Sequence, residues 1–294
     1  MIRLLVTLFA GLFGLAFGSF LNVCLSRWPM GESVVAPRSH CRTCARTLAW
    51  WENIPLLSWI VLRGRCRTCK EPISWRYPLV EAAVGGLWAL IGWRLAGQML
   101  FADALLGTSS TLPPLSLAEA IGLAIFCLLM VGLAALDAEH FWLADAATLP
   151  GAAAGLVYSL YWAGMLGWRF LLSGPFLRAV GERLLAIFVA AGFILLIRWL
   201  YWIIRHREGL GLGDAKLMAL LAAWLGLPGA ALAFEVAVGL GTLAALVVLL
   251  QPRRKGQPWA QVKLPLGTFL CLGGIVSAFW GEPLIAFYMK WAGM

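Results

Sequence analysis

The chain has 294 residues, of which 62% are hydrophobic and only 13% are charged, and its mean hydropathy is +0.85. Soluble domains carry about 25% charged residues, so the composition excludes an ordinary soluble protein and indicates an integral membrane protein. The formal net charge of +9 does not indicate a nucleic-acid partner, because no soluble segment gathers basic and aromatic residues on one face.

The first apolar run extends from Leu4 to Cys24. A membrane-crossing helix needs about 20 apolar residues. This run is longer than the core of an ordinary signal peptide and lacks a small-x-small cleavage site. We therefore predict a retained transmembrane helix over residues 1–25, a soluble segment over residues 26–77 and a larger transmembrane domain over residues 78–294.

Hydropathy predicts about eight transmembrane helices and therefore an all-α, polytopic membrane protein. The expected spans cover residues 4–25, 78–98, 118–137, 143–165, 183–204, 214–228, 230–250 and 264–288. The sixth span is short and is broken by Pro228-Gly229, so an arrangement with seven spans is the alternative.

Basic residues are unevenly distributed among the loops. Sixteen of the 23 lysines and arginines lie within residues 27–76, 205–216 and 253–263, whereas residues 98–117 contain none. An excess of basic residues is typical of cytoplasmic loops. We predict that the three basic loops are cytoplasmic, that both termini lie on the other side, and that anionic membrane lipids attract the basic residues.

The soluble segment is too small to form a strong core of its own. It contains two Cys-x-x-Cys pairs, Cys41 with Cys44 and Cys66 with Cys69, at a spacing close to that of zinc ribbons. Four cysteines in this pattern predict a closed, structural zinc site. The alternative of two disulfides suits a cytoplasmic loop poorly. The spacing does not distinguish zinc from iron or from a metal-free form.

Two groups of carboxylates lie at predicted ends of membrane spans, where acidic residues are costly and often functional. Asp137 belongs to the Asp-Ala-Glu-His sequence that ends the third span, and Asp145 follows closely. Asp214 follows a Gly-Leu-Gly-Leu-Gly stretch at the start of the sixth span. The predicted topology puts both groups at the cytoplasmic face. We therefore predict that Asp137 and Asp214 form a catalytic pair.

Two carboxylates close together do not both ionise, so one can take a proton from water while the other polarises a peptide carbonyl. Because a helix N-terminus favours an anion, we expect Asp214 to carry the charge and Asp137 the proton. One alternative is that Asp214 is only a helix N-cap. Another is a metal site formed by Asp137, Glu139, His140 and Asp145.

Further motifs follow one another along nearly the whole chain. They are Gly18-Ser19-Phe20-Leu21-Asn22-Val23, Ser39-His40-Cys41, Trp51-Glu52-Asn53-Ile54-Pro55, Ile73-Ser74-x-Arg76-Tyr77-Pro78-Leu79-Val80-Glu81, Leu136-Asp137-x-x-His140, Gly211-x-Gly213-Asp214-x-Lys216 and Leu264-Pro265-Leu266-Gly267. This series resembles the bifunctional prepilin peptidases of type IV pilus and type II secretion systems, which are GxGD membrane aspartyl proteases. The chain departs from the family pattern at Arg42, Glu139 and Ala144, and none of these departures removes an aspartate of the pair or a paired cysteine.

The resemblance implies that Asp137 and Asp214 cleave the leader of prepilins or pseudopilins, after a glycine and before a Phe-like residue. The reaction would take place at the cytoplasmic face of the bacterial inner membrane. The resemblance also implies methylation of the new N-terminal amine from S-adenosylmethionine, but no glycine-rich nucleotide fingerprint identifies residues for it. The alternative is a transporter or an assembly scaffold with a metal-binding loop; acids paired at one membrane edge favour proteolysis.

Overall fold

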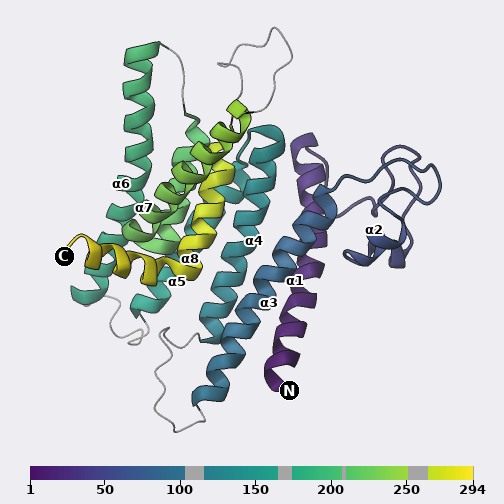
Figure 1. The fold of residues 1–294 in the computed structure, drawn as a ribbon, viewed down its shortest axis with the longest axis horizontal. Helices are drawn as coiled ribbons and strands as arrows, with labels where there is room; N and C mark the ends of the chain where they lie inside the picture. Colours follow the sequence, from purple (N-terminus) through teal and green to yellow (C-terminus); the bar gives the residue numbers. More distant parts are fainter. Residues whose placement is uncertain (103–115, 165–173, 207–209, 251–263, 294) are drawn as a thin grey trace. The chain divides into compact units, whose positions relative to one another are not determined.

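Helices make up almost all of the regular structure in the computed structural model, which describes residues 1–102, 116–164, 174–206, 210–250 and 264–293. The elements in chain order are α1 (Ile2–Arg27), the 3-10 helices η1 (Trp28–Met30) and η2 (Trp50–Asn53), α2 (Leu57–Val61), α3 (Arg76–Ala102), α4 (Leu117–His140), α5 (Asp145–Gly164), α6 (Gly174–Arg205), α7 (Leu212–Leu250) and α8 (Leu266–Trp291) (Figure 1). The all-α prediction is confirmed for these residues. The basic loop at 253–263, Gly209 and most of the loop at 98–117 lie outside them.

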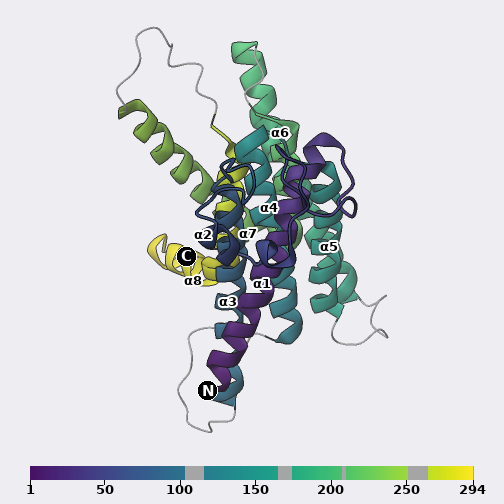
Figure 2. The same cartoon turned by 90° about the vertical axis from the view of Figure 1, so that its right-hand side faces the viewer.

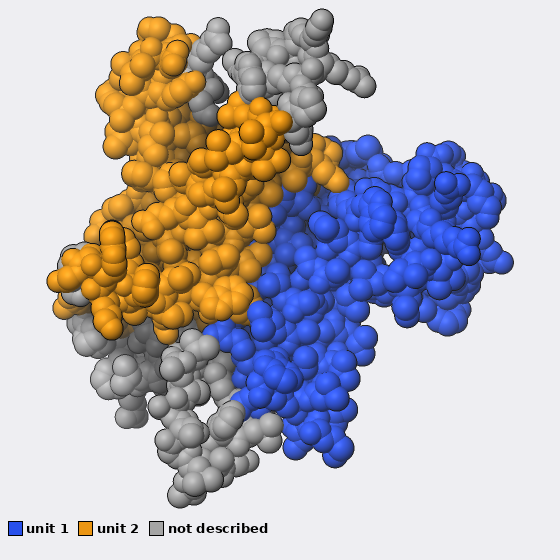
Figure 3. All heavy atoms as spheres, viewed as in Figure 1, with its two compact units in different colours: residues 1–135 blue, residues 136–294 orange. Residues whose placement is uncertain are grey.

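The chain divides into two compact units, Met1–Ala135 and Leu136–Met294, which are coloured separately in Figure 3. The boundary falls inside α4. The predicted division into residues 1–25, 26–77 and 78–294 stays a prediction.

In the first unit, α1 and α3 run side by side (Figures 1 and 2). The ring centroids of Phe17 and Trp88 are 5.0 Å apart, and Asn22 Nδ2 donates to the Tyr77 carbonyl at 2.9 Å. Trp88 Nε1 also donates to the carbonyl of Ala124 in α4 at 3.1 Å. Ring packing and polar side-chain contacts therefore join these three helices, as is typical of helices packed in a membrane.

Between α1 and α3, residues 28–75 form only short elements. Two isolated β-bridges, His40 with Thr47 and Arg65 with Pro72, each close a loop around one Cys-x-x-Cys pair. The segment buries very few of its own residues. Because so little apolar surface is buried, it needs a cross-link other than a hydrophobic core.

In the second unit, α5, α6 and α8 pack against α7. Trp224 Nε1 donates to the carbonyl of Gly151 in α5 at 2.9 Å, and Ser277 of α8 donates to a carbonyl of α7 at 2.9 Å. Helix α7 is kinked at Gly226, whose φ of 73° and ψ of 179° lie outside the helical region and favour glycine. Pro228 then opens the second helical segment, where its missing N–H is not needed.

Six helices in the described residues are long and apolar enough to cross a membrane, namely α1, α3, α4, α6, α7 and α8. The expected count of about eight spans is not confirmed. The predicted sixth and seventh spans fall in the single kinked helix α7. Helix α5, the predicted fourth span, is not among the six.

Large apolar side chains cover the outer faces of these helices. Phe9 and Phe188 are 69% and 71% exposed, and Trp199 is 55% exposed. Apolar surface of this extent is unfavourable in water but is the expected surface towards lipid. With the six apolar helices, it identifies the chain as a multi-pass integral membrane protein.

Candidate active site and cysteine cluster

Asp137 lies in the last turn of α4 and is 6% exposed. Its Oδ2 accepts hydrogen bonds from the Thr268 backbone N–H at 2.7 Å and from the Thr268 hydroxyl at 3.2 Å. Thr268 belongs to the first turn of α8, where backbone N–H groups lack helical partners. A Cβ at Gly267 would lie 2.8 Å from Asp137 Oδ2, so a glycine at this position leaves room for the carboxylate.

Asp214 lies in the first turn of α7 and is 9% exposed. Its Oδ2 accepts the N–H of Gly211 at 3.0 Å. A carboxylate at the third helical position that reaches back to the N-cap N–H is half of a capping box. Asp214 therefore does cap α7, as the alternative interpretation held, but from inside the helix rather than from the N-cap position.

Asp137 and Asp214 lie within electrostatic range of each other. Leu143 packs against Gly213, which precedes Asp214, and against Gly267, which lies beside Asp137. The structure thus brings the two predicted acids into one site. Their assignment as the catalytic pair stays a prediction.

The helix-dipole argument for a protonated Asp137 is incomplete. It considered only the C-terminus of α4, whereas the first turn of α8 donates its N–H to the Asp137 carboxylate. Both aspartates face helix N-termini, which favour an anion at either position. The position of a shared proton is therefore a property of the pair and does not follow from the dipoles.

An ion pair borders this site. Lys216 Nζ lies 2.6 Å from Asp145 Oδ1 and joins the N-terminal part of α7 to the start of α5. Both side chains are partly exposed, so the pair orients these helix ends more than it stabilises the fold.

The alternative metal site would use the acids and the histidine around Asp137. His140 Nε2 lies 3.8 Å from Glu139 Oε2. Across the residues that the structure describes, the acids around Asp137 form no cluster of metal ligands, so the alternative metal site gains no support.

The two Cys-x-x-Cys pairs adopt the same turn. The residue after each pair donates its N–H to the carbonyl of the first cysteine, from Ala45 to Cys41 at 2.9 Å and from Lys70 to Cys66 at 3.1 Å. Ala45 and Lys70 have positive φ angles of 56° and 62°. All four cysteines are described, and none forms a disulfide.

The four sulfur atoms fit a single metal ion. They lie within 4.8 Å of one another, and the Sγ atoms of Cys41 and Cys69 are 3.7 Å apart. In a tetrahedral zinc site with bonds of about 2.3 Å, the sulfur atoms are about 3.8 Å apart. Backbone N–H groups of Cys69 and Thr68 lower the pKa of the Cys66 thiol to about 6. This shift favours the thiolate that a metal requires.

Glu52, for which sequence reasoning found no role, joins η2 to the first cysteine turn. Its two oxygens accept hydrogen bonds from the Arg46 guanidinium at 2.7 and 3.0 Å, and the Ala49 N–H donates to Oε2 at 2.8 Å. A bidentate pair of this kind fixes geometry as well as charge. Glu52 is therefore a structural residue of the cysteine segment.

Sequence reasoning did not identify Thr268 as the partner of Asp137. The motif that ends at Gly267 was recognised, and its proline marks a helix start. Nothing in the local sequence says which carboxylate that helix start faces.

Comparisons with known proteins agree with these features. The Bacterial Peptidase A24 N-terminal domain matches residues 12–95, and the Type IV leader peptidase family matches residues 123–247. The prepilin leader peptidase/N-methyltransferase of Burkholderia pseudomallei strain 1026b is 35% identical, over 97% of this chain and 88% of the relative. The protein of the same name from Klebsiella pneumoniae is 38% identical over 74% of this chain and 84% of the relative. The one from Pseudomonas aeruginosa is 30% identical over 96% of this chain and 93% of the relative.

No solved structure matches the chain. The relatives cover most of its length, and the two family models cover the cysteine segment and both aspartates. The resemblance seen in the motifs is confirmed, and the chain belongs to the type IV leader peptidase family.

Proposed function

We propose that this protein cleaves the leader peptide from type IV prepilins or pseudopilins and then N-methylates the new N-terminus. The observation that supports cleavage most strongly is the pair of buried aspartates in one membrane unit, each held by the start of a helix. The name shared by the relatives supports both reactions. It does not favour the alternative of a transporter or scaffold.

Asp137 and Asp214 would share one proton in the free enzyme, because two like charges close together do not both ionise readily. The ionised carboxylate takes a proton from the attacking water, and the neutral carboxyl donates a hydrogen bond to the scissile carbonyl. The hydrogen bonds from Thr268 and Gly211 hold the two groups in place before substrate arrives.

Zinc is the metal that we propose for Cys41, Cys44, Cys66 and Cys69, because four cysteine thiolates close the coordination shell of a structural zinc ion. The ion would cross-link residues 28–75 and take no part in proteolysis.

We further propose that the protein lies in the bacterial inner membrane with its basic loops in the cytoplasm, next to anionic lipid. Eight crossings would require α5 and both segments of the kinked helix α7 to enter the membrane. The substrate is itself a membrane-anchored precursor.

The test uses the full-length protein in detergent, a prepilin with a Gly-Phe junction, and S-adenosylmethionine. Mass spectrometry follows the loss of the leader and the gain of one methyl group on the new N-terminus. We expect both products. An intact substrate after prolonged incubation with several prepilins and pseudopilins would contradict the proposal.

A further inference from the structure

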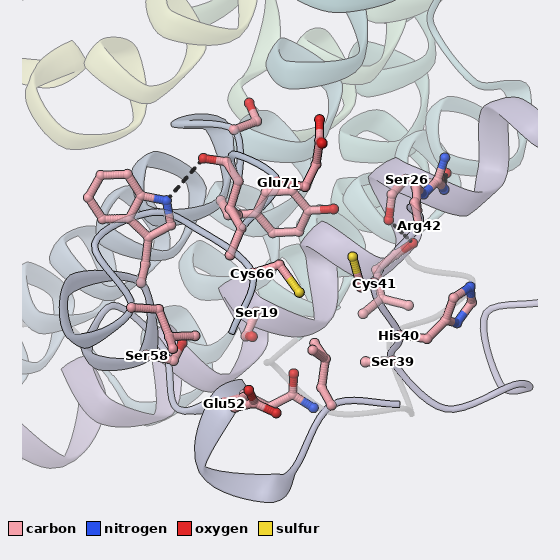
Figure 4. Close-up of a pocket in the computed structure, with 18 of the residues that line it drawn as sticks. Ser19, Ser26, Ser39, His40, Cys41, Arg42, Glu52, Ser58, Cys66 and Glu71 are labelled. Carbon is pink, nitrogen blue, oxygen red and sulfur yellow. Dashed lines mark hydrogen bonds between the residues drawn. The ribbon is translucent and has the colours of Figure 1, made fainter. Parts of the chain in front are cut away.

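A cavity of about 630 Å³ lies within the first unit, lined by α1, the cysteine-bearing segment and the start of α3 (Figure 4). A volume of this order is typical of sites for small molecules. The cavity belongs to Met1–Ala135, whereas both aspartates of the proposed protease site belong to the other unit. Neither aspartate lines the cavity, and Cys41 and Cys66 of the proposed zinc site form only part of its wall.

One part of the cavity lining is apolar and firmly held. It includes Phe20, Leu62 and Trp59. Trp59 Nε1 donates to the Ile73 carbonyl at 3.2 Å, and the ring centroids of Trp59 and Trp75 are 4.1 Å apart. A fixed aromatic side chain is a suitable surface for a planar ring such as an adenine base.

Two buried glutamates line the same cavity, and their surroundings differ. Glu52 already has its cation, since Arg46 donates to both of its oxygens. Glu81 is 7% exposed and accepts the Leu56 N–H at 2.8 Å. No ion pair reaches Glu81 from the residues that the structure describes.

The backbone is strained where it contacts Glu81. Leu56 has φ 59° and ψ −50°, a conformation that a leucine rarely adopts. Its N–H nevertheless points at the Glu81 carboxylate. Local strain of this kind is often found at functional sites. A buried carboxylate without a cation is costly, so it either takes up a proton or binds a cationic ligand.

We propose that this cavity is the methyl-transfer site, in which S-adenosylmethionine occupies the space beside Trp59 and Glu81 binds the α-ammonium group of the cleaved pilin. This inference rests on the proposed function. It adds where the second reaction, N-methylation, takes place and which residue binds the amine that is methylated. The bound donor supplies an electrophilic methyl group on a sulfonium.

The proton and electron balance of this step is simple. Glu81 accepts one proton from the α-ammonium group, which leaves a neutral amine. The nitrogen lone pair forms the new N–C bond as the C–S bond breaks and its electron pair passes to sulfur. The positive charge moves from sulfur to the secondary ammonium product, and Glu81 returns its proton to solvent. No oxidant or metal is needed.

The test uses full-length protein in detergent and a synthetic pilin peptide that already begins with phenylalanine, so that methylation does not depend on cleavage. We expect Glu81→Gln to methylate this peptide about 100-fold or more slowly, because a general base is removed. Cleavage of an intact prepilin should stay within about twofold of the wild-type rate. Glu182→Gln, on an exposed side chain of α6, is the matched control and should leave both rates unchanged.

A second variant tests the cavity itself. Val23 of α1 lines the space, and Val23→Trp should fill it. Calorimetric titration with S-adenosylmethionine should show binding to the wild type and to Glu81→Gln, and at least tenfold weaker binding to Val23→Trp, with cleavage retained. Wild-type methylation in Glu81→Gln, unchanged donor binding in Val23→Trp, or loss of cleavage together with methylation would each overturn the inference. Absence of any cleavage by the wild type would instead count against the proposed function.

Discussion

At the level of single residues, each aspartate is positioned by a backbone N–H at a helix start, which for Asp137 belongs to the distant helix α8 and for Asp214 to its own helix α7. Asp137 accepts the N–H of Thr268, which is 131 positions away in sequence, and Asp214 accepts the N–H of Gly211. Backbone donors in a helix first turn are fixed before substrate binds, so they need little reorganisation during a reaction. The carboxylates are therefore rigidly placed, as a general acid–base pair requires.

Gly267→Ala should impair cleavage strongly. The added Cβ would lie 2.8 Å from Asp137 Oδ2, so the carboxylate would have to move. A displacement of about 1 Å can lower a rate by about 100-fold. The measurement is the rate of prepilin cleavage in detergent.

Gly192→Ala in α6 is the matched control for this substitution, because nothing lies within 4 Å of a Cβ at that position. It should cleave at the wild-type rate. Equal rates for Gly267→Ala and the wild type would mean that the geometry of Asp137 does not limit cleavage.

Sequence reasoning identified the residues of this site but not their contacts. Asp137 and Asp214 stood out because acids at membrane edges are rare, and the Cys-x-x-Cys spacing predicted the sulfur cluster that the structure contains. The contact of Asp137 with Thr268 could not be predicted, because it depends on how α4 and α8 pack. The helix-dipole argument for the proton was incomplete for the same reason, and the assignment itself stays a prediction.

At the level of elements, the cysteine segment shows how a short loop with little core can hold a defined shape. Its two turns present four sulfur atoms within 4.8 Å of one another. Because few residues of the segment are buried, bound metal should account for most of its order.

The purified protein should contain about one zinc ion per chain by elemental analysis, because the four thiolates form one closed site. Cys66→Ser should lower the zinc content markedly and reduce the midpoint of thermal unfolding in detergent. Cys127→Ala, which removes a thiol buried in α4 away from the cluster, is the control and should keep the zinc. Full zinc content in Cys66→Ser would rule out the four-sulfur site.

The kink in α7 explains one difference between the predicted and observed elements. Sequence reasoning placed the break at Pro228-Gly229, whereas the non-helical residue is Gly226. A proline is the stronger signal in a sequence, but Pro228 can begin a helical segment without distorting it. The positive φ angle of Gly226 is a property of the folded chain that the sequence does not display.

Gly226→Ala should therefore destabilise the protein. An alanine at φ 73° and ψ 179° costs about 1–3 kcal/mol of strain. The unfolding midpoint in detergent should fall, whereas Gly239→Ala in the same helix, where a Cβ meets nothing within 4 Å, should not lower it. An unchanged midpoint for Gly226→Ala would show that α7 can straighten at no cost.

At the level of the whole molecule, composition alone identified the protein class. An apolar chain with basic residues concentrated in a few loops predicted a polytopic all-α membrane protein, and six apolar helices in the described residues agree. The number of crossings could not be derived, because window hydropathy does not recognise a kinked helix as one element. Family membership rests on the ordered motifs, which the comparisons confirm.

The most direct test of the central claim is the rate of prepilin cleavage by Asp137→Asn and Asp214→Asn. Asparagine has nearly the same shape as aspartate but neither accepts the proton of water nor donates one from a carboxyl group. If the two aspartates act as one acid–base pair, each substitution should lower kcat by about 100-fold or more, and the double variant should be little worse than either alone. Cleavage at the wild-type rate by either variant would contradict the account.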